Sequence, residues 1–253
     1  MRRLFLTALL ALAGCASAPA LPPLVGADGA PFDLLLLGEQ HDAAQHQDLH
    51  RRVVAALAGS GKLAAVVLEM AERGHSTAGL ARNATEAQVR QALGWEQSGW
   101  SWEAYRPAVM AAVTAGVPVL GGNLPRAEMR KAMADMRFDS MLPGPALKAQ
   151  QQAVREGHCD LLPERQVTPM TRIQIARDEA MAQTLEGAAA PGKTVVLLAG
   201  GRHVDGDLGI PLHLRPGLRV QTRQWPAPPP KKDYCAELEV QLRSHGGATP
   251  SMP

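Results

Sequence analysis

Acidic and imidazole side chains gather directly after short apolar runs of the chain. Glu39 and His41 follow the first run, and because they are two residues apart they leave an extended backbone on the same face. His46 lies on the helical pattern that comes next, and His203 follows the last strong apolar run. A carboxylate next to imidazoles can bind a metal ion or act as an acid–base pair. These four side chains predict either a divalent metal site or a hydrolytic site.

Other residues near these histidines suit the binding of an anion. Gly200 and Gly201 supply bare backbone beside Arg202, and a guanidinium suits a carboxylate or phosphate. The alternative for Arg202 is an ordinary surface residue, and the alternative for His46 is a packed helix residue. Asp42 suits the N-cap of the following helix. Asp178, on a later helical pattern, is either solvated or orients the histidines.

The elements that must position these residues are short, buried strands alternating with helices. Each apolar run has the length of a strand that is buried on both faces. The runs are Leu34–Leu37, Ala65–Leu68, Val117–Leu120 and Thr194–Leu198, with a weaker alternating run at Leu218–Thr222. This pattern predicts an α/β fold with a central, mainly parallel sheet and flanking helices. Because loops at the carboxyl ends of parallel strands converge, the polar residues should meet at one rim of the sheet.

Some segments between the predicted strands contain more helical pattern than one crossover between parallel strands needs, and this surplus indicates the domain organisation. Residues 76–106 and 126–190 hold this surplus, and they predict a smaller all-helical subdomain over one end of the sheet. The α/β domain as a whole is expected over residues 32–225. Residues 15–31 are rich in Pro, Ala and Gly and predict a flexible tether. Residues 226–253 predict a Pro-rich linker and a C-terminal tail.

The amino terminus has the basic start, short apolar run and small-residue end of a secretory signal over residues 1–14. Leu12-Ala13-Gly14-Cys15 resembles a bacterial lipobox, in which the signal is removed and the Cys receives lipid. Acyl chains at Cys15 would hold the protein on a membrane without a spanning helix. Ala16, in place of Asp, favours the outer membrane over the inner one. The alternative is an ordinary signal peptide that ends near a Cys.

Composition and charge exclude several classes of protein. The chain has 253 residues, of which 46% are hydrophobic and 20% charged, so it is neither disordered nor fibrous. Lys and Arg number 26 against 24 Asp and Glu, and removing Arg2 and Arg3 with the signal leaves 24 of each. This balance gives no support to nucleic-acid binding.

Two further cysteines, Cys159 and Cys235, can pair in a compartment outside the cytoplasm. We predict one disulfide that ties the tail to the body of the protein. The alternative is two unrelated thiols.

Aromatic residues are rare, at 4% of the chain, but three of the four Trp and Tyr105 lie within residues 95–105. Their concentration predicts either a surface for a flat apolar ligand or rings that cap a core, and the core interpretation is favoured for each Trp. The phenolic oxygen of Tyr105 differs, because such an oxygen can ligate ferric haem iron.

Taken together and in order, these motifs resemble the ChaN-like haem-binding lipoproteins. The motifs are Gly38-Glu39-Gln40-His41-Asp42 with His46, Leu68-Glu69-Met70, Trp102-Glu103-Ala104-Tyr105-Arg106-Pro107, Gly122-Asn123-Leu124-Pro125-Arg126, Gln174 with Arg177-Asp178 and Met181-Ala182, and Gly200-Gly201-Arg202-His203-Val204 with Gly209-Ile210-Pro211. The resemblance runs from about Leu34 to Leu214. The superfamily also contains Tiki-type metalloproteases and erythromycin-esterase-like hydrolases.

The resemblance implies a dimer that binds haem at its interface through a tyrosine ligand. Tyr105 is the only tyrosine within the matching motifs, so it is the candidate iron ligand, and Tyr234 in the tail is the poorer choice. The residues expected to contact the propionates or the second haem face are His41, His46, Arg202 and His203.

The favoured hypothesis is a lipid-anchored haem-binding protein of the bacterial envelope that serves haem or iron uptake without turnover. An outer-membrane haem receptor would be a partner. The alternative is a hydrolase, with or without a divalent metal, that uses Glu39 as general base together with His41 and His203. A third hypothesis is a degenerate enzyme fold that serves as an envelope adaptor.

Overall fold

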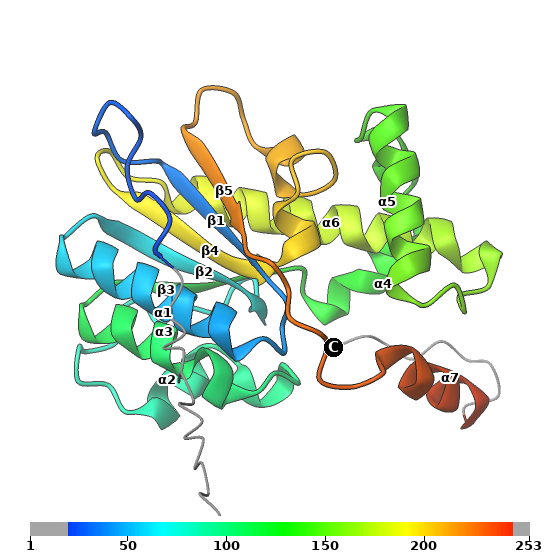
Figure 1. Ribbon diagram of the computed structural model, residues 1–253, viewed down its shortest axis with the longest axis horizontal. Coiled ribbons are helices and arrows are strands. Elements are labelled where there is room, and N and C mark those ends of the chain that lie inside the picture. The colour runs from blue at the N-terminus through cyan, green and yellow to red at the C-terminus, as the bar shows by residue number, and fades with distance from the viewer. Residues whose placement is uncertain (1–19, 245–253) are drawn as a thin grey trace, which may run out of the picture.

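The structure is a computed structural model that describes residues 20–244 (Figure 1). The predicted signal segment and the predicted lipid-bearing Cys15 lie outside the described residues. Within residues 20–244, no helix is both long enough and apolar enough to cross a membrane.

A five-stranded sheet forms the centre of the molecule, with the strand order β3-β2-β4-β1-β5 and every pairing parallel. The strands are β1 (Leu34–Glu39), β2 (Leu63–Glu72), β3 (Val119–Asn123), β4 (Thr194–Gly200) and β5 (Val220–Gln224). Each predicted apolar run overlaps one of these strands. The weak run forms β5 at an edge of the sheet, as predicted. The prediction of a parallel α/β sheet is therefore confirmed.

Seven α-helices and four 3-10 turns surround the sheet in the part of the chain that the structure describes (Figure 1). The helices are α1 (Ala44–Gly59), α2 (Glu86–Ala92), α3 (Trp102–Thr114), α4 (Arg126–Ala134), α5 (Gly144–Gly157), α6 (Glu164–Ala188) and α7 (Tyr234–Ser244). The 3-10 turns are η1 (Trp95–Gln97), η2 (Met136–Ser140), η3 (Gly201–Val204) and η4 (Ile210–His213).

Helices cover both faces of the sheet, which explains why its strands are apolar on both sides. On one face, α1 and α3 pack against side chains such as Leu35 and Leu37. On the other face, α6 packs its apolar stripe against Leu34 and Leu36. All four leucines of β1 are fully buried. The rigid sheet between two layers of helices fixes the position of every residue at its carboxyl rim.

The helical subdomain is built from the second insertion. There α4, η2 and α5 share a separate hydrophobic core with part of α6. This core includes Phe138, Leu142 and Ile175. Residues 76–106 were expected to join this subdomain, but their buried side chains, such as Val89 and Leu93, belong to the core of the sheet. They pack there because α2 and η1 lead directly into α3.

After β5, the tail runs past the start of α1. The carbonyl of Pro226 accepts a hydrogen bond from His46 (3.2 Å). Asp42 then accepts hydrogen bonds from the Lys231 backbone N–H and the Tyr234 hydroxyl, both at 2.9 Å. In α7 no residue is buried, so these contacts and a disulfide hold the tail. We call residues 226–244 the tail strap.

Asp42 is not the N-cap of α1, contrary to the prediction. Ala43 occupies that position and makes no side-chain capping bond. Burial favours the neutral acid of Asp42, but hydrogen bonds from Lys231, Gln40 and Tyr234 outweigh it and lower its pKa to about 2. The carboxylate is therefore engaged by the tail strap.

The segment before β1 is attached to the domain over the residues that the structure describes. Asp28 forms a two-pronged ion pair with Arg219, at 2.7 and 2.8 Å. Val25 and Pro31 form an isolated antiparallel bridge, and Leu21 and Leu24 pack against the core. Residues 20–31, part of the expected tether, thus lie against the sheet domain.

Candidate functional site

The polar residues that follow the strands meet at the carboxyl rim of the sheet, as predicted. A cavity of about 270 Å³ opens there, which we call the rim cavity. Glu39 and His41 line it from the end of β1, and residues 200–203 line it from the end of β4. Residues of α5 and α6 form the opposite wall.

Glu39 orients the His41 ring through a hydrogen bond. The Glu39 side chain is fully buried, and its Oε1 accepts hydrogen bonds from the Tyr105 hydroxyl (2.5 Å) and from His41 Nδ1 (2.9 Å). The His41 side chain is 35% exposed, and a Cβ at Gly200 would lie only 2.8 Å from its Nε2. Glycine at position 200 thus leaves room for the imidazole.

Burial lowers the pKa of His41, but the Glu39 hydrogen bond and the charges of Glu69 and Glu39 outweigh this effect and raise it. The protonated form of His41 is therefore favoured at the cavity wall. Glu39 is enclosed, so the expectation that it acts as a general base on a substrate is not met by this arrangement. It positions His41 instead.

His203 is buried between two carboxylates. Its Nδ1 lies 2.5 Å from Asp178 Oδ1, and its Nε2 lies 3.3 Å from Glu69 Oε1. Burial lowers the pKa of His203, but the charges of Glu69 and Asp178 raise it more, to about 10. His203 is therefore an imidazolium whose two nitrogens are both engaged. Of the two alternatives for Asp178, the structure shows the one in which it orients a rim histidine.

Glu69 lies at the centre of the buried network. Its Oε2 accepts a hydrogen bond from the Gly200 N–H (2.7 Å), and Arg177 lies 3.6 Å from its Oε1. Burial raises the pKa of Glu69, but the nearby charges of His203, His41 and Arg177 outweigh burial and lower it well below its ordinary value. Glu69 thus links the end of β2 to the end of β4, and it also contacts His41 and His203.

Tyr105 lies in the interior, where it does not suit the expected role of iron ligand. It is 2% exposed, and its hydroxyl is held by Glu39. Burial, followed by the charge of Glu39, raises the pKa of the phenol, whereas a haem ligand must be a phenolate with an open oxygen. Tyr105 lies next to Glu39, but the sequence pattern did not show that its position on α3 buries the hydroxyl in the interior.

The tryptophans near Tyr105 are mostly core rings. Trp95 and Trp102 are buried, with centroids 5.1 Å apart. Trp100 reaches the rim, where its ring centroid lies 4.5 Å from that of His41. The core interpretation therefore describes Trp95 and Trp102, and Trp100 supports the rim histidine.

His46 is a packed helix residue and not a cavity residue. It is 1% exposed, its Nδ1 accepts a hydrogen bond from the Gln40 N–H (3.0 Å), and its Nε2 donates to Pro226. Both ring nitrogens bond to backbone groups, so this arrangement offers no support for the expected haem contact at His46. Arg202, in contrast, is at the cavity, with a largely exposed side chain that pairs with Glu156 (2.8 Å).

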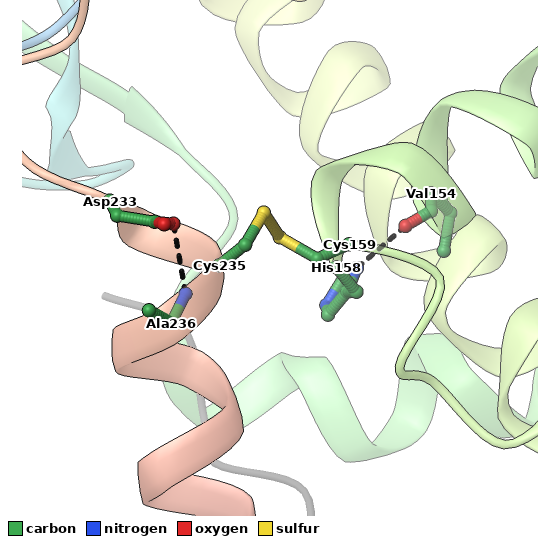
Figure 2. Close-up of a disulfide and its surroundings, with 6 residues drawn as sticks. All are labelled: Val154, His158, Cys159, Asp233, Cys235 and Ala236. Atoms are coloured by element: carbon green, nitrogen blue, oxygen red, sulfur yellow. Dashed lines mark hydrogen bonds between the residues drawn. A yellow bond between two sulfur atoms is a disulfide. The ribbon is translucent and has the colours of Figure 1, made fainter.

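His158, at the C-cap of α5, is a cavity residue that sequence reasoning missed. Its ring donates from Nδ1 to the Val154 carbonyl (2.7 Å; Figure 2). Its Nε2 is buried and has no hydrogen-bond partner in the described part of the chain. The next residue, Cys159, forms a disulfide with Cys235, with a Cα–Cα distance of 5.6 Å. No apolar run or motif precedes His158, so only this neighbouring cysteine drew attention to the region.

A divalent metal site, one of the two expected chemistries, is not supported. Within residues 20–244, no group of three or more His, Cys, Asp or Glu side chains is arranged to hold a metal ion. The physical reason is that the rim side chains already pair with one another: Glu39 with His41, and His203 with Asp178.

One family model and two solved structures are similar to this chain. A family model described as haem-binding uptake, Tiki superfamily, ChaN matches residues 27–214, more than half of the chain. A solved structure of ChaN of Campylobacter jejuni, described by its cofacial heme binding, matches with a TM-score of 0.63 and 23% identity over 76% of this chain and 81% of that chain. At that identity the likeness shows the fold. The type III effector HopBA1 matches with a TM-score of 0.40 and 15% identity over 75% of each chain. Among curated proteins, none matches.

Proposed function

The chain belongs to the ChaN family of haem-binding proteins in the Tiki superfamily, and from this premise we propose that it binds haem at the rim cavity. We propose further that the protein serves haem or iron uptake from the bacterial envelope, where lipid at Cys15 anchors it to the outer membrane. An outer-membrane haem receptor is the proposed partner.

The observation that carries this proposal is the combination of cations and apolar wall at the rim cavity. The His41 imidazolium and the Arg202 guanidinium lie at the cavity, opposite the apolar side chains of Ala153 and Val154. Haem has the matching chemistry, because it is a flat apolar ring that carries two carboxylates. Arg202 and His41 would pair with these propionates, and the α5 wall would pack against the ring.

The buried nitrogen of His158 also fits haem, because it is an imidazole nitrogen on the cavity wall that has no hydrogen-bond partner among the described residues. Bound haem would supply a coordinating, redox-active iron. The protein's own residues would bind the propionates, keep the ring in place and exclude water from one face.

The size of the rim cavity favours a second copy of the chain as part of the site. A cavity of about 270 Å³ is smaller than the roughly 300–1,000 Å³ typical of small-molecule sites. Haem would therefore be covered on one side only. We propose that a second subunit covers the remaining face, so that haem binding promotes a homodimer.

Haem binding is tested by titrating haemin into the full-length chain in detergent and recording visible absorption against a detergent blank. We expect saturable binding that is weakened in His41→Ala and Arg202→Ala. Arg165→Ala is the matched control, because Arg165 is exposed on α6 and outside the rim cavity. Absence of saturable binding would contradict the proposal, as would unchanged affinity in both cavity variants.

The lipid anchor is tested separately by fractionating bacterial envelopes that contain the Cys15→Ala variant. We expect the variant to leave the membrane fraction, because a signal peptide alone gives no lasting attachment. Retention of the variant in detergent-extractable membranes would rule out lipid at Cys15 as the anchor.

A metal-free hydrolase is the second candidate, and the arrangement of His41 favours it. A carboxylate holds His41 Nδ1 while the ring borders the cavity, which is the orientation used in acid–base catalysis. Because its pKa is raised, His41 would act first as a proton donor, with Glu39 as the positioning residue and buried His203 as a fixed charge. Turnover of ester or peptide substrates that disappears in His41→Ala would support this candidate, and no turnover across such substrates would remove it.

A further inference from the structure

We propose that His158 binds the haem iron through its Nε2, a role that rests on the proposed haem function of the rim cavity. The hydrogen bond from Nδ1 to the Val154 carbonyl is 2.7 Å long. A carbonyl oxygen carries no hydrogen, so Nδ1 must be the donor. In the neutral ring, Nε2 then carries a lone pair that faces no hydrogen-bond partner among residues 20–244.

An unpartnered nitrogen in this position requires an explanation, because buried polar groups almost always have hydrogen-bond partners. The His158 residue is 4% exposed, and it lines the rim cavity. Histidines that ligate metals typically donate their other ring N–H to a carbonyl or carboxylate, which fixes the ring and raises its basicity. His158 has the same arrangement at Nδ1, which donates to the Val154 carbonyl.

The other rim side chains are less suited to iron. His41 is held by Glu39 at Nδ1, and its Nε2 lies 3.8 Å from the Glu69 carboxylate, so it suits a propionate. Both nitrogens of His203 are engaged by carboxylates. Tyr105 is enclosed and bound to Glu39. Of the described residues on the cavity wall, His158 is the imidazole that remains available.

The position of His158 is fixed by its neighbours. It forms the C-cap of α5, and the next two residues, Cys159 and Asp160, have left-handed backbones with φ of 56° and 55°. The disulfide to Cys235 ties this turn to the tail strap. Because Nε2 has almost no exposed surface, iron binding requires a small movement of the turn, and the disulfide limits how far the turn moves.

The test is a haemin titration of the full-length, oxidised chain in detergent, with visible and electron paramagnetic resonance spectra. His158→Ala removes the ring, and His158→Gln keeps a side-chain donor for the Val154 carbonyl while removing the imidazole. His75→Ala is the matched control, because His75 is exposed and outside the rim cavity. The thermal midpoint and the intact disulfide of each variant, measured without haemin, establish that it is folded.

We expect the wild type to show an imidazole-ligated spectrum. Both His158 variants should lose this spectrum and bind more than about tenfold more weakly, and added imidazole should restore the spectrum in His158→Ala. His75→Ala should match the wild type.

Two results would overturn the assignment while leaving the haem function intact. One is a wild-type spectrum and affinity in folded His158→Ala and His158→Gln, and the other is a tyrosinate spectrum in the saturated wild type. If the wild type fails to bind haemin saturably, the haem function fails and the role of His158 fails with it.

Discussion

At the scale of single residues, the buried carboxylates of the rim position other groups. Glu39 holds both Tyr105 and His41, and Glu69 holds the Gly200 backbone beside His203. Each buried charge has an opposite charge or a hydrogen-bond donor nearby, which is what makes its burial tolerable. The cavity is therefore lined by imidazole and guanidinium groups, and the buried carboxylates next to them are already paired.

Tyr105→Phe tests the role of the tyrosine as a support for Glu39. Removing the hydroxyl leaves a buried carboxylate with one donor fewer, so we expect the free energy of unfolding to fall by about 1–3 kcal/mol. The haemin spectrum should be unchanged, because the hydroxyl is not open to iron. Chemical denaturation and haemin titration measure the two quantities. Loss of the spectrum in a folded variant would return Tyr105 to the role of ligand.

The pairing of His203 with Asp178 predicts a pH dependence of stability. The pKa of His203 is raised to about 10 in the folded protein from an ordinary 6.5. Its stabilising contribution is fully present below about pH 6.5 and is lost as the pH rises towards 10. Asp178→Asn should reduce this dependence and cost about 3 kcal/mol or more near pH 6, because it breaks a buried pair.

Urea denaturation of the wild type and Asp178→Asn at a series of pH values measures this difference. Asp205→Asn, at a half-buried position in the loop after η3, is the control that removes a carboxylate outside the pair. Parallel stability curves for the wild type and Asp178→Asn would contradict the assigned charge of His203.

At the scale of elements, the strands were predictable because burial on both faces demands continuous apolar runs. The rim location of Glu39, His41 and His203 followed from the same argument, since the carboxyl ends of parallel strands converge. Glu69 also follows an apolar run, but the sequence did not show that it forms the centre of the network. That role depends on the order of β2 and β4 in the sheet, which is a long-range property.

The tail strap and α5 were less predictable, because their positions depend on contacts between distant segments. Asp42 looked like a helix cap, yet residues far along the chain engage its carboxylate. His158 became a cavity residue only because α5 folds back over the rim. Neither placement leaves a periodic signal in the local sequence.

Reducing the disulfide tests how the tail strap is held. Cys159 and Cys235 are 76 residues apart, and closing such a loop is worth about 4 kcal/mol in the chain-entropy model. Because α7 buries no residue, we expect reduction to abolish hydrogen-exchange protection in α7 while the sheet keeps its protection.

Cys159→Ser with Cys235→Ser should reproduce the reduced state, and the same reductant should leave this double variant unchanged. Full protection of α7 after reduction would show that the hydrogen bonds to His46 and Asp42 hold the tail strap without the disulfide.

At the scale of the whole molecule, the sheet supplies a rigid rim and the helical subdomain supplies the opposite wall of the cavity. The wall comes from α5 and α6, which also pack in a core of their own beside α4 (Figure 1). A ligand in the rim cavity would therefore contact both parts of the molecule. Family membership supports haem as the ligand, and the rim cavity is the place that we propose for it on this chain.

The measurement that tests this account most directly is an NMR comparison of the isotope-labelled full-length chain with ferric haemin and with diamagnetic gallium protoporphyrin. The paramagnetic iron broadens signals of nearby nuclei and so reports where the haem lies. We predict selective broadening at Gly157, Gly200 and Gly201, around the rim cavity. Broadening centred away from this rim, or no difference between the two porphyrins, would contradict the account.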